Sequence, residues 1–114
     1  IRTFAPELLI ISAGYDAHIQ DPLGTLAVST AGYASLAGIV YNLAAEVCGG
    51  RLVGVLEGGY NLEALGEGVV VTMRQWLGQR LSVPAPEVSH IPEPDLSLLI
   101  NALSAHHPLV RAGE

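Results

Sequence analysis

The stretch ELLIISAGYDAHIQDPLG, residues 7–24, decides the fold class of this chain. It begins with a short, uninterrupted apolar run, which is typical of a strand buried on both faces. A second run of the same kind, RLVGVL at residues 51–56, leads into the tight loop EGGYN.

Helical patterns follow both strands. Between Ala31 and Cys48 the apolar residues recur at helical spacing, with Ser29 and Thr30 as candidate N-caps and Gly49-Gly50 as the expected end. Residues 62–81 show a second helical pattern. Strands that alternate with helices predict right-handed crossovers and an α/β fold with a parallel sheet. The loops that follow the two strands should therefore meet at the carboxyl edge of the sheet, where such folds bind ligands.

Composition narrows the functional classes. The 114 residues are 50% apolar and carry a net charge of −6, and the five basic residues form no cluster, which argues against nucleic acid as a partner. No apolar run is long enough to predict a membrane span. Cys48 is the only cysteine, so neither a disulfide framework nor a thiolate metal cluster is expected, and the cytoplasm is the default compartment.

The loop after the first strand places Asp16, His18 and Asp21 within six positions. Two carboxylates and one imidazole are suitable ligands for a divalent ion such as Zn²⁺. They could form one compact metal site, or some of them could bond the loop backbone while one group faces the cleft.

The second loop contains Gly58, Gly59 and Tyr60. The glycines permit positive φ angles and close approach of a ligand, and a phenol at a strand end can donate a hydrogen bond to a developing oxyanion. A plain turn with a buried tyrosine is the alternative.

Taken in order, SAGYDAHIQDPLG, GYASLAG and GGRLVGVLEGGYNLEAL resemble the C-terminal third of the histone deacetylase superfamily, over about residues 4–80. This superfamily includes bacterial acetoin-utilisation relatives and acetylpolyamine amidohydrolases. The motif LEGGYNL resembles the class II-like branch more than class I, which usually has a further glycine at the position of Glu57. The resemblance implies a three-layer α/β/α, arginase-like fold with a parallel sheet. Residues 1–81 would be part of the catalytic domain, 82–95 a proline-rich linker and 96–108 the terminal helix of that domain.

The resemblance also implies an activity and its residues. Such enzymes hydrolyse the N-acetyl amide of an acetyl-lysine protein or an acetylpolyamine with one Zn²⁺. Asp21 would be a zinc ligand, Tyr60 would polarise the amide carbonyl, and Gly58 and Gly59 would line the substrate channel. Asp16 is expected to brace the loop or support a ligand, and His18 to be a neighbour of the site.

Two parts of the family pattern are missing from the 114 residues: the upstream Asp-x-His motif that supplies the other zinc ligands, and the catalytic His-His pair. Asp16-Ala17-His18 has the spacing of the first motif but is not expected to replace it, because Asp16 belongs to the GxDA turn of the family pattern. The pair His106-His107 follows the proline-rich segment and is not expected to replace the catalytic pair. We therefore expect the chain to be a piece of a longer deacetylase, inactive in isolation. A catalytically dead module that binds acyl ligands is the alternative, and a generic nucleotide-binding domain fits less well because the first loop is long and acidic.

Overall fold

The computed structural model describes residues 1–79 and 97–106. A short 3-10 helix at Arg2–Phe4 comes before the regular elements. These are β1 (Leu9–Ala13), α1 (Thr30–Cys48), β2 (Leu52–Leu56), α2 (Leu62–Trp76) and α3 (Ser97–His106). The expected linker at 82–95 lies outside the described residues, and α3 lies within the segment expected to form the terminal helix.

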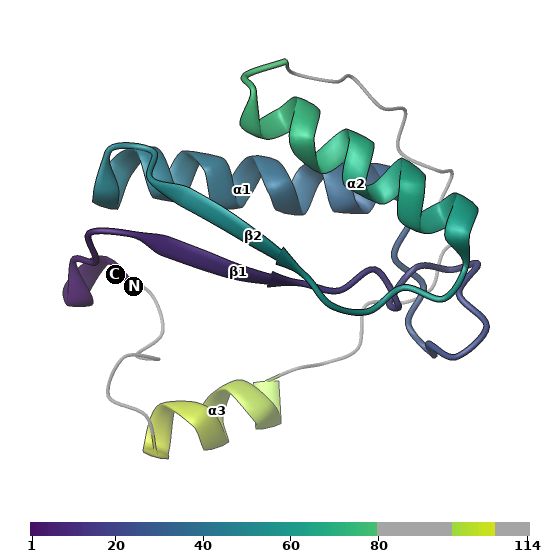
Figure 1. Ribbon diagram of the computed structural model, residues 1–114. Helices are drawn as coiled ribbons and strands as arrows, with labels where there is room; N and C mark the ends of the chain where they lie inside the picture. The colour runs from purple at the N-terminus through teal and green to yellow at the C-terminus, as the bar shows by residue number, and fades with distance from the viewer. Residues whose placement is uncertain (80–96, 107–114) are drawn as a thin grey trace.

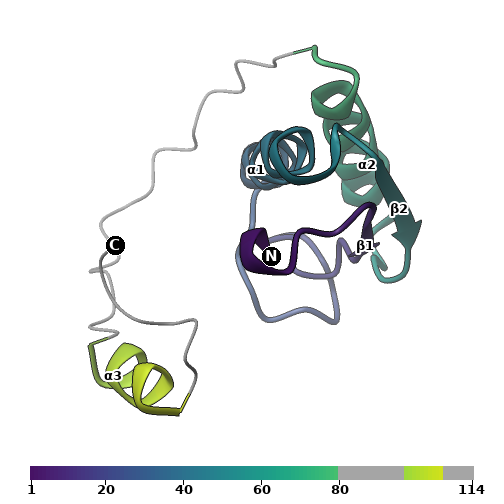
Figure 2. The ribbon, with the colours of Figure 1, turned by 90° about the vertical axis from the view of Figure 1, so that its left-hand side faces the viewer.

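β1 and β2 pair in parallel, with a register that runs from Leu9 opposite Leu52 to Ala13 opposite Leu56. Figure 1 shows both strands pointing toward the loops at one end, with α1 and α2 on the same side of the sheet. Figure 2, turned by 90°, shows the two helices side by side along that face. The prediction of an α/β fold with parallel strands is therefore confirmed.

Helix α1 begins and ends as the sequence predicts. The side chain of Ser29 accepts a hydrogen bond from the backbone N–H of Gly32, which satisfies a donor that the first helical turn leaves free. Gly49 adopts the left-handed conformation at φ 62° and ends the helix. This conformation costs glycine little because it has no Cβ.

Helix α2 is shorter than predicted: it ends at Trp76, whereas the sequence pattern continued to 81. Gly78 adopts a φ of 75°, its N–H donates to the carbonyl of Gln75, and the N–H of Gln79 donates to the carbonyl of Arg74. These are the two hydrogen bonds of a Schellman motif. The apolar periodicity therefore overestimated the helix, and Gly78 was the better indicator of its end.

The core lies between the helices and the sheet and is built from Tyr15, Tyr33, Ala34 and Val71. The other face of the sheet is open: Ile10 is 65% exposed, and the next strand leaves Val53 and Val55 about half exposed on the same side. The described residues thus form two layers of the expected three. No helix in the described part of the chain is both long and apolar enough to span a membrane.

Candidate functional site

The two polar loops meet at the carboxyl edge of the sheet, as the topology predicts. The N–H of Glu57 donates to the carbonyl of Ala13 at 3.0 Å, and the N–H of Tyr15 donates to the carbonyl of Gly58 at 2.8 Å. Backbone pairing thus continues beyond the strands and brings the start of the acidic loop against the Gly-Gly-Tyr loop. The two loops that carry the candidate site residues therefore lie against each other at this edge.

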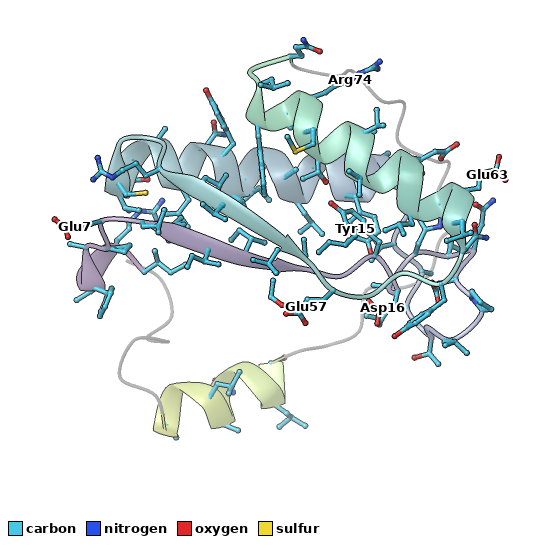
Figure 3. All side chains as sticks on the ribbon, viewed as in Figure 1. Glu7, Tyr15, Asp16, Glu57, Glu63 and Arg74 are labelled. Carbon is cyan, nitrogen blue, oxygen red and sulfur yellow. The ribbon has the colours of Figure 1, made fainter. Side chains whose placement is uncertain are left out.

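Asp16 presents its carboxylate at this edge. The residue is exposed, and among the hydrogen bonds of the described residues none involves its side chain. Figure 3 shows Asp16 on the side of the sheet that faces away from α1 and α2, near Glu57, whereas Tyr15 points toward the helices. The expected role of Asp16 as a hydrogen-bonded brace of its own loop is therefore not what the structure shows.

Glycines make room for this carboxylate. A Cβ at Gly58 would lie 2.9 Å from Cγ of Asp16, and a Cβ at Gly14 would lie 2.9 Å from its Oδ1. Both distances are shorter than side chains tolerate, so only glycine at these positions allows Asp16 its observed place. Gly58 was expected to allow a positive φ, but only Gly59 of this pair has one, at 138°.

Asp21 is in a different environment, with only 8% of its surface exposed. Its Oδ1 accepts the N–H groups of Leu23 and Gly24 at 2.9 and 3.0 Å. Its Oδ2 accepts those of Tyr60 and Asn61 at 2.7 and 3.3 Å. Four donors fill about as many lone-pair positions as a carboxylate offers.

These contacts also set the charge state of Asp21. Burial by itself raises the pKa of this carboxyl, but the four backbone N–H groups stabilise the anion more, so the net pKa lies below its ordinary value. Asp21 is thus an ionised carboxylate that links the two loops and is stabilised by backbone N–H groups. The expectation that Asp21 binds zinc stays a prediction, and these hydrogen bonds weigh against it.

His18 is 3% exposed, and both ring nitrogens are engaged. The backbone N–H of Gln20 donates to Nδ1 at 3.2 Å, so the proton is on Nε2, which lies 3.1 Å from Oγ1 of Thr30. The Thr30 hydroxyl in turn donates to Glu67 at 3.0 Å. His18 therefore ties its loop to the start of α1, and the expectation that it is a neighbour of the site stays a prediction.

Tyr60 is 58% exposed and stands where β2 leads into α2. Asn61 follows it and caps α2 through a side chain that accepts the N–H groups of Glu63 and Ala64. Asn61 also donates from Nδ2 to the carbonyl of Gln20 at 3.0 Å, a further link between the loops.

The described residues contain no group of three His, Cys, Asp or Glu side chains placed to hold one metal ion. The hypothesis of a compact metal site made by Asp16, His18 and Asp21 is therefore wrong. The side chains of His18 and Asp21 are buried, and hydrogen bonds occupy their polar atoms. Of these three residues, only Asp16 presents an exposed carboxylate, the kind of group that can bind a metal ion. The sequence contained a signal that Asp21 would be engaged in its own loop. Asp-Pro-Leu-Gly favours an Asx-type turn, in which the aspartate accepts hydrogen bonds from the N–H groups of the second and third residues after it.

The chain has two parallel strands, and its acidic loop and Gly-Gly-Tyr loop lie at one edge of the sheet. This arrangement defines the class of α/β proteins that carry their site beyond the strand ends. Comparison with known proteins identifies the family within this class. Residues 1–76 match the histone deacetylase domain, and the chain belongs to that family.

Individual relatives agree with this assignment. The chain is 54% identical over 78 residues to histone deacetylase 14, chloroplastic, from Arabidopsis thaliana, which covers 68% of this chain and 18% of that protein. It is 41% identical over 102 residues to the human polyamine deacetylase HDAC10, covering 90% of this chain and 14% of that protein.

Two solved structures share the fold. The crystal structure of the HDA15 HD domain aligns with a TM-score of 0.60 at 38% identity, covering 72% of this chain and 22% of that one. An acetylpolyamine aminohydrolase from Burkholderia pseudomallei aligns with a TM-score of 0.56 at 31% identity, covering 70% and 22%. The chain therefore spans only 14% to 22% of the length of these four proteins.

Proposed function

We propose that this chain is the C-terminal part of the catalytic domain of a zinc-dependent deacetylase, which hydrolyses the acetyl amide of a lysine side chain or a polyamine. The observation that supports it is the junction of the two loops, which places an exposed carboxylate and an exposed phenol at one sheet edge. The names of the relatives support the reaction: they include histone deacetylases and a polyamine deacetylase.

Asp16 is the residue of this chain that we propose as a zinc ligand, in place of Asp21. Its carboxylate is exposed at the sheet edge and has no hydrogen-bond partner among the described residues, whereas that of Asp21 is saturated. When bound, Zn²⁺ would polarise the acetyl carbonyl and lower the pKa of a water molecule. Further ligands and the proton-accepting histidines would come from other parts of the protein.

Tyr60 would supply the second stabilising group. A phenol at the sheet edge can donate its hydrogen bond to the oxygen of the amide carbonyl as negative charge develops there. Its exposure leaves the hydroxyl accessible to a substrate. Gly58 and Gly59 would let the substrate chain pass close to the backbone beside it, although Gly58 also serves to accommodate Asp16.

The test uses a full-length protein that carries this chain. Tyr60→Phe should lower turnover of an acetyl-lysine peptide about a hundred- to a thousandfold, the usual effect of removing one oxyanion donor, while zinc is retained. Unchanged turnover would refute the role of Tyr60.

A paired metal measurement separates the two aspartates. Asp16→Asn should lose zinc on dialysis, and Asp21→Asn should keep it. The opposite result would restore the ligand assignment made from the sequence. Both variants replace a carboxylate by an amide of the same size, so each serves as the control of the other.

A catalytically dead acyl-ligand binding module is the second candidate. It would be favoured if the full-length protein had neither a catalytic His-His pair nor the upstream Asp-x-His motif. Binding of an acetyl-lysine peptide without release of acetate by the full-length protein would support this candidate and contradict the first.

The compartment stays a prediction. The lone cysteine fits the cytoplasm, but two of the relatives, from Arabidopsis thaliana and Oryza sativa, are named as chloroplastic.

A further inference from the structure

The carboxylate of Asp21 joins the two loops of the site, and we propose that it is the positioning residue for Tyr60. This inference rests on the proposed function in one respect, namely that Tyr60 acts on the substrate. The link itself is a feature of the fold and can be measured without activity.

The two oxygens of Asp21 have separate tasks. Oδ1 accepts only from its own loop, through the N–H groups of Leu23 and Gly24. Oδ2 accepts only from the other loop, and its bond to the N–H of Tyr60, at 2.7 Å, is the shortest of the four. One buried anion thus closes a turn in the first loop and holds the main chain of the second.

Tyr60 depends on this link because its side chain has no hydrogen-bond partner of its own among the described residues. More than half of the residue is exposed, so packing restrains the phenol weakly. Its location therefore follows from its main chain, which the N–H bond to Asp21 anchors on one side. On the other side Asn61 is fixed by its bonds to Asp21 and Gln20 and by capping α2.

The chemistry of the link requires a carboxylate. An asparagine offers one acceptor oxygen and one amide nitrogen, which is a donor. If the oxygen keeps the local turn with Leu23 and Gly24, the NH₂ group faces the N–H groups of Tyr60 and Asn61, donor against donor. Asp21→Asn should therefore release the Gly-Gly-Tyr loop while leaving the first loop closed.

The decisive experiment is a double-mutant cycle in a full-length protein that carries the chain, with Asp21→Asn, Tyr60→Phe and both together. Asp21→Asn alone should lower kcat about a hundredfold, the cost of misplacing a reacting group by about 1 Å, with little change in KM. In the Tyr60→Phe background the same change should alter kcat by no more than about twofold, because the hydroxyl that it positions is already absent. A purely structural loss would instead lower kcat by the same factor in both backgrounds.

Two readouts do not require turnover. Hydrogen exchange at the amides of Tyr60 and Asn61 should accelerate in Asp21→Asn, and zinc content should match that of the parent protein. Glu63→Gln is the matched control: it converts an exposed carboxylate at the start of α2 to an amide, and both exchange and kcat should stay unchanged.

Three results would overturn the proposal: unchanged exchange at Tyr60 in Asp21→Asn, equal losses of kcat in the two backgrounds, or loss of zinc from Asp21→Asn. Failure of the proposed function is a different outcome, because the parent protein would then show no deacetylation. In that case the exchange measurement still decides whether Asp21 holds the loop.

Discussion

Gly58→Ala tests the geometry of the site most directly. The added methyl group would lie 2.9 Å from Cγ of Asp16 and 3.0 Å from each carboxylate oxygen. Carbon atoms pack best about 3.5–4.0 Å apart, so the carboxylate would have to move by roughly 0.6–1 Å. Because Asp16 is exposed, it can move at little cost to stability, and the effect should appear in metal binding.

The expected loss of zinc affinity is about ten- to a hundredfold, the range found when a group that orients a metal ligand is altered. It is measured by competition with a chelator of known affinity in a full-length protein that carries the chain, with the thermal midpoint recorded in parallel. Gly14→Ala, in the same loop as Asp16, should also lower zinc affinity, because its Cβ would lie 2.9 Å from Oδ1 of Asp16. The control is Gly66→Ala on α2, where an added Cβ meets nothing within 4 Å.

The sequence predicted instead that Gly58 lines the substrate channel. In that case Gly58→Ala should have a different effect. A methyl group that narrows the channel would raise KM and leave zinc affinity unchanged. If Gly58→Ala and Gly14→Ala both bind zinc as the parent protein does, Asp16 is not the ligand, and the reasoning from the glycines is refuted.

Two further predictions concern stability. Gly68→Ala should destabilise the protein by about 1–3 kcal/mol by overpacking, because its Cβ would overlap Cδ1 of buried Tyr15 and lie 2.8 Å from Cε1. Gly66→Ala on the same helix should stabilise the protein by about 0.5–1 kcal/mol, because an added Cβ there meets nothing within 4 Å. Denaturant titration of both variants checks the contrast, and equal effects would contradict it. Folding lowers the pKa of Asp21 from its ordinary value of 3.8, so the Asp21 anion stabilises the folded protein. This stabilisation is complete above pH 3.8 and is lost as the pH falls through the lower pKa that Asp21 has in the folded state. Urea midpoints of the parent protein and Asp21→Asn should therefore differ at pH 7 and converge below about pH 3.8; a constant difference would mean that the anion is not responsible.

Local patterns were sufficient for most of the fold. The two apolar runs became β1 and β2, and Ser29 and Gly49 bound α1 where the sequence placed them, because capping depends on neighbours within one helical turn. The end of α2 was misjudged because apolar periodicity continued past Gly78, whose left-handed conformation stops the helix. The third layer was expected from the family resemblance, and the described residues do not form it.

The sequence by itself determined that two parallel strands deliver both polar loops to one edge, since alternating strands and helices permit few topologies. It could not determine which aspartate remains free. That depends on the N–H of Tyr60, 39 positions from Asp21 in the chain, which reaches the carboxylate only after the loops have met. A buried carboxylate requires hydrogen-bond donors, and the folded backbone supplies four of them to Asp21, whereas Asp16 receives space from two glycines and stays exposed. Tertiary structure thus assigned one aspartate to hold the site together and left the other available to bind.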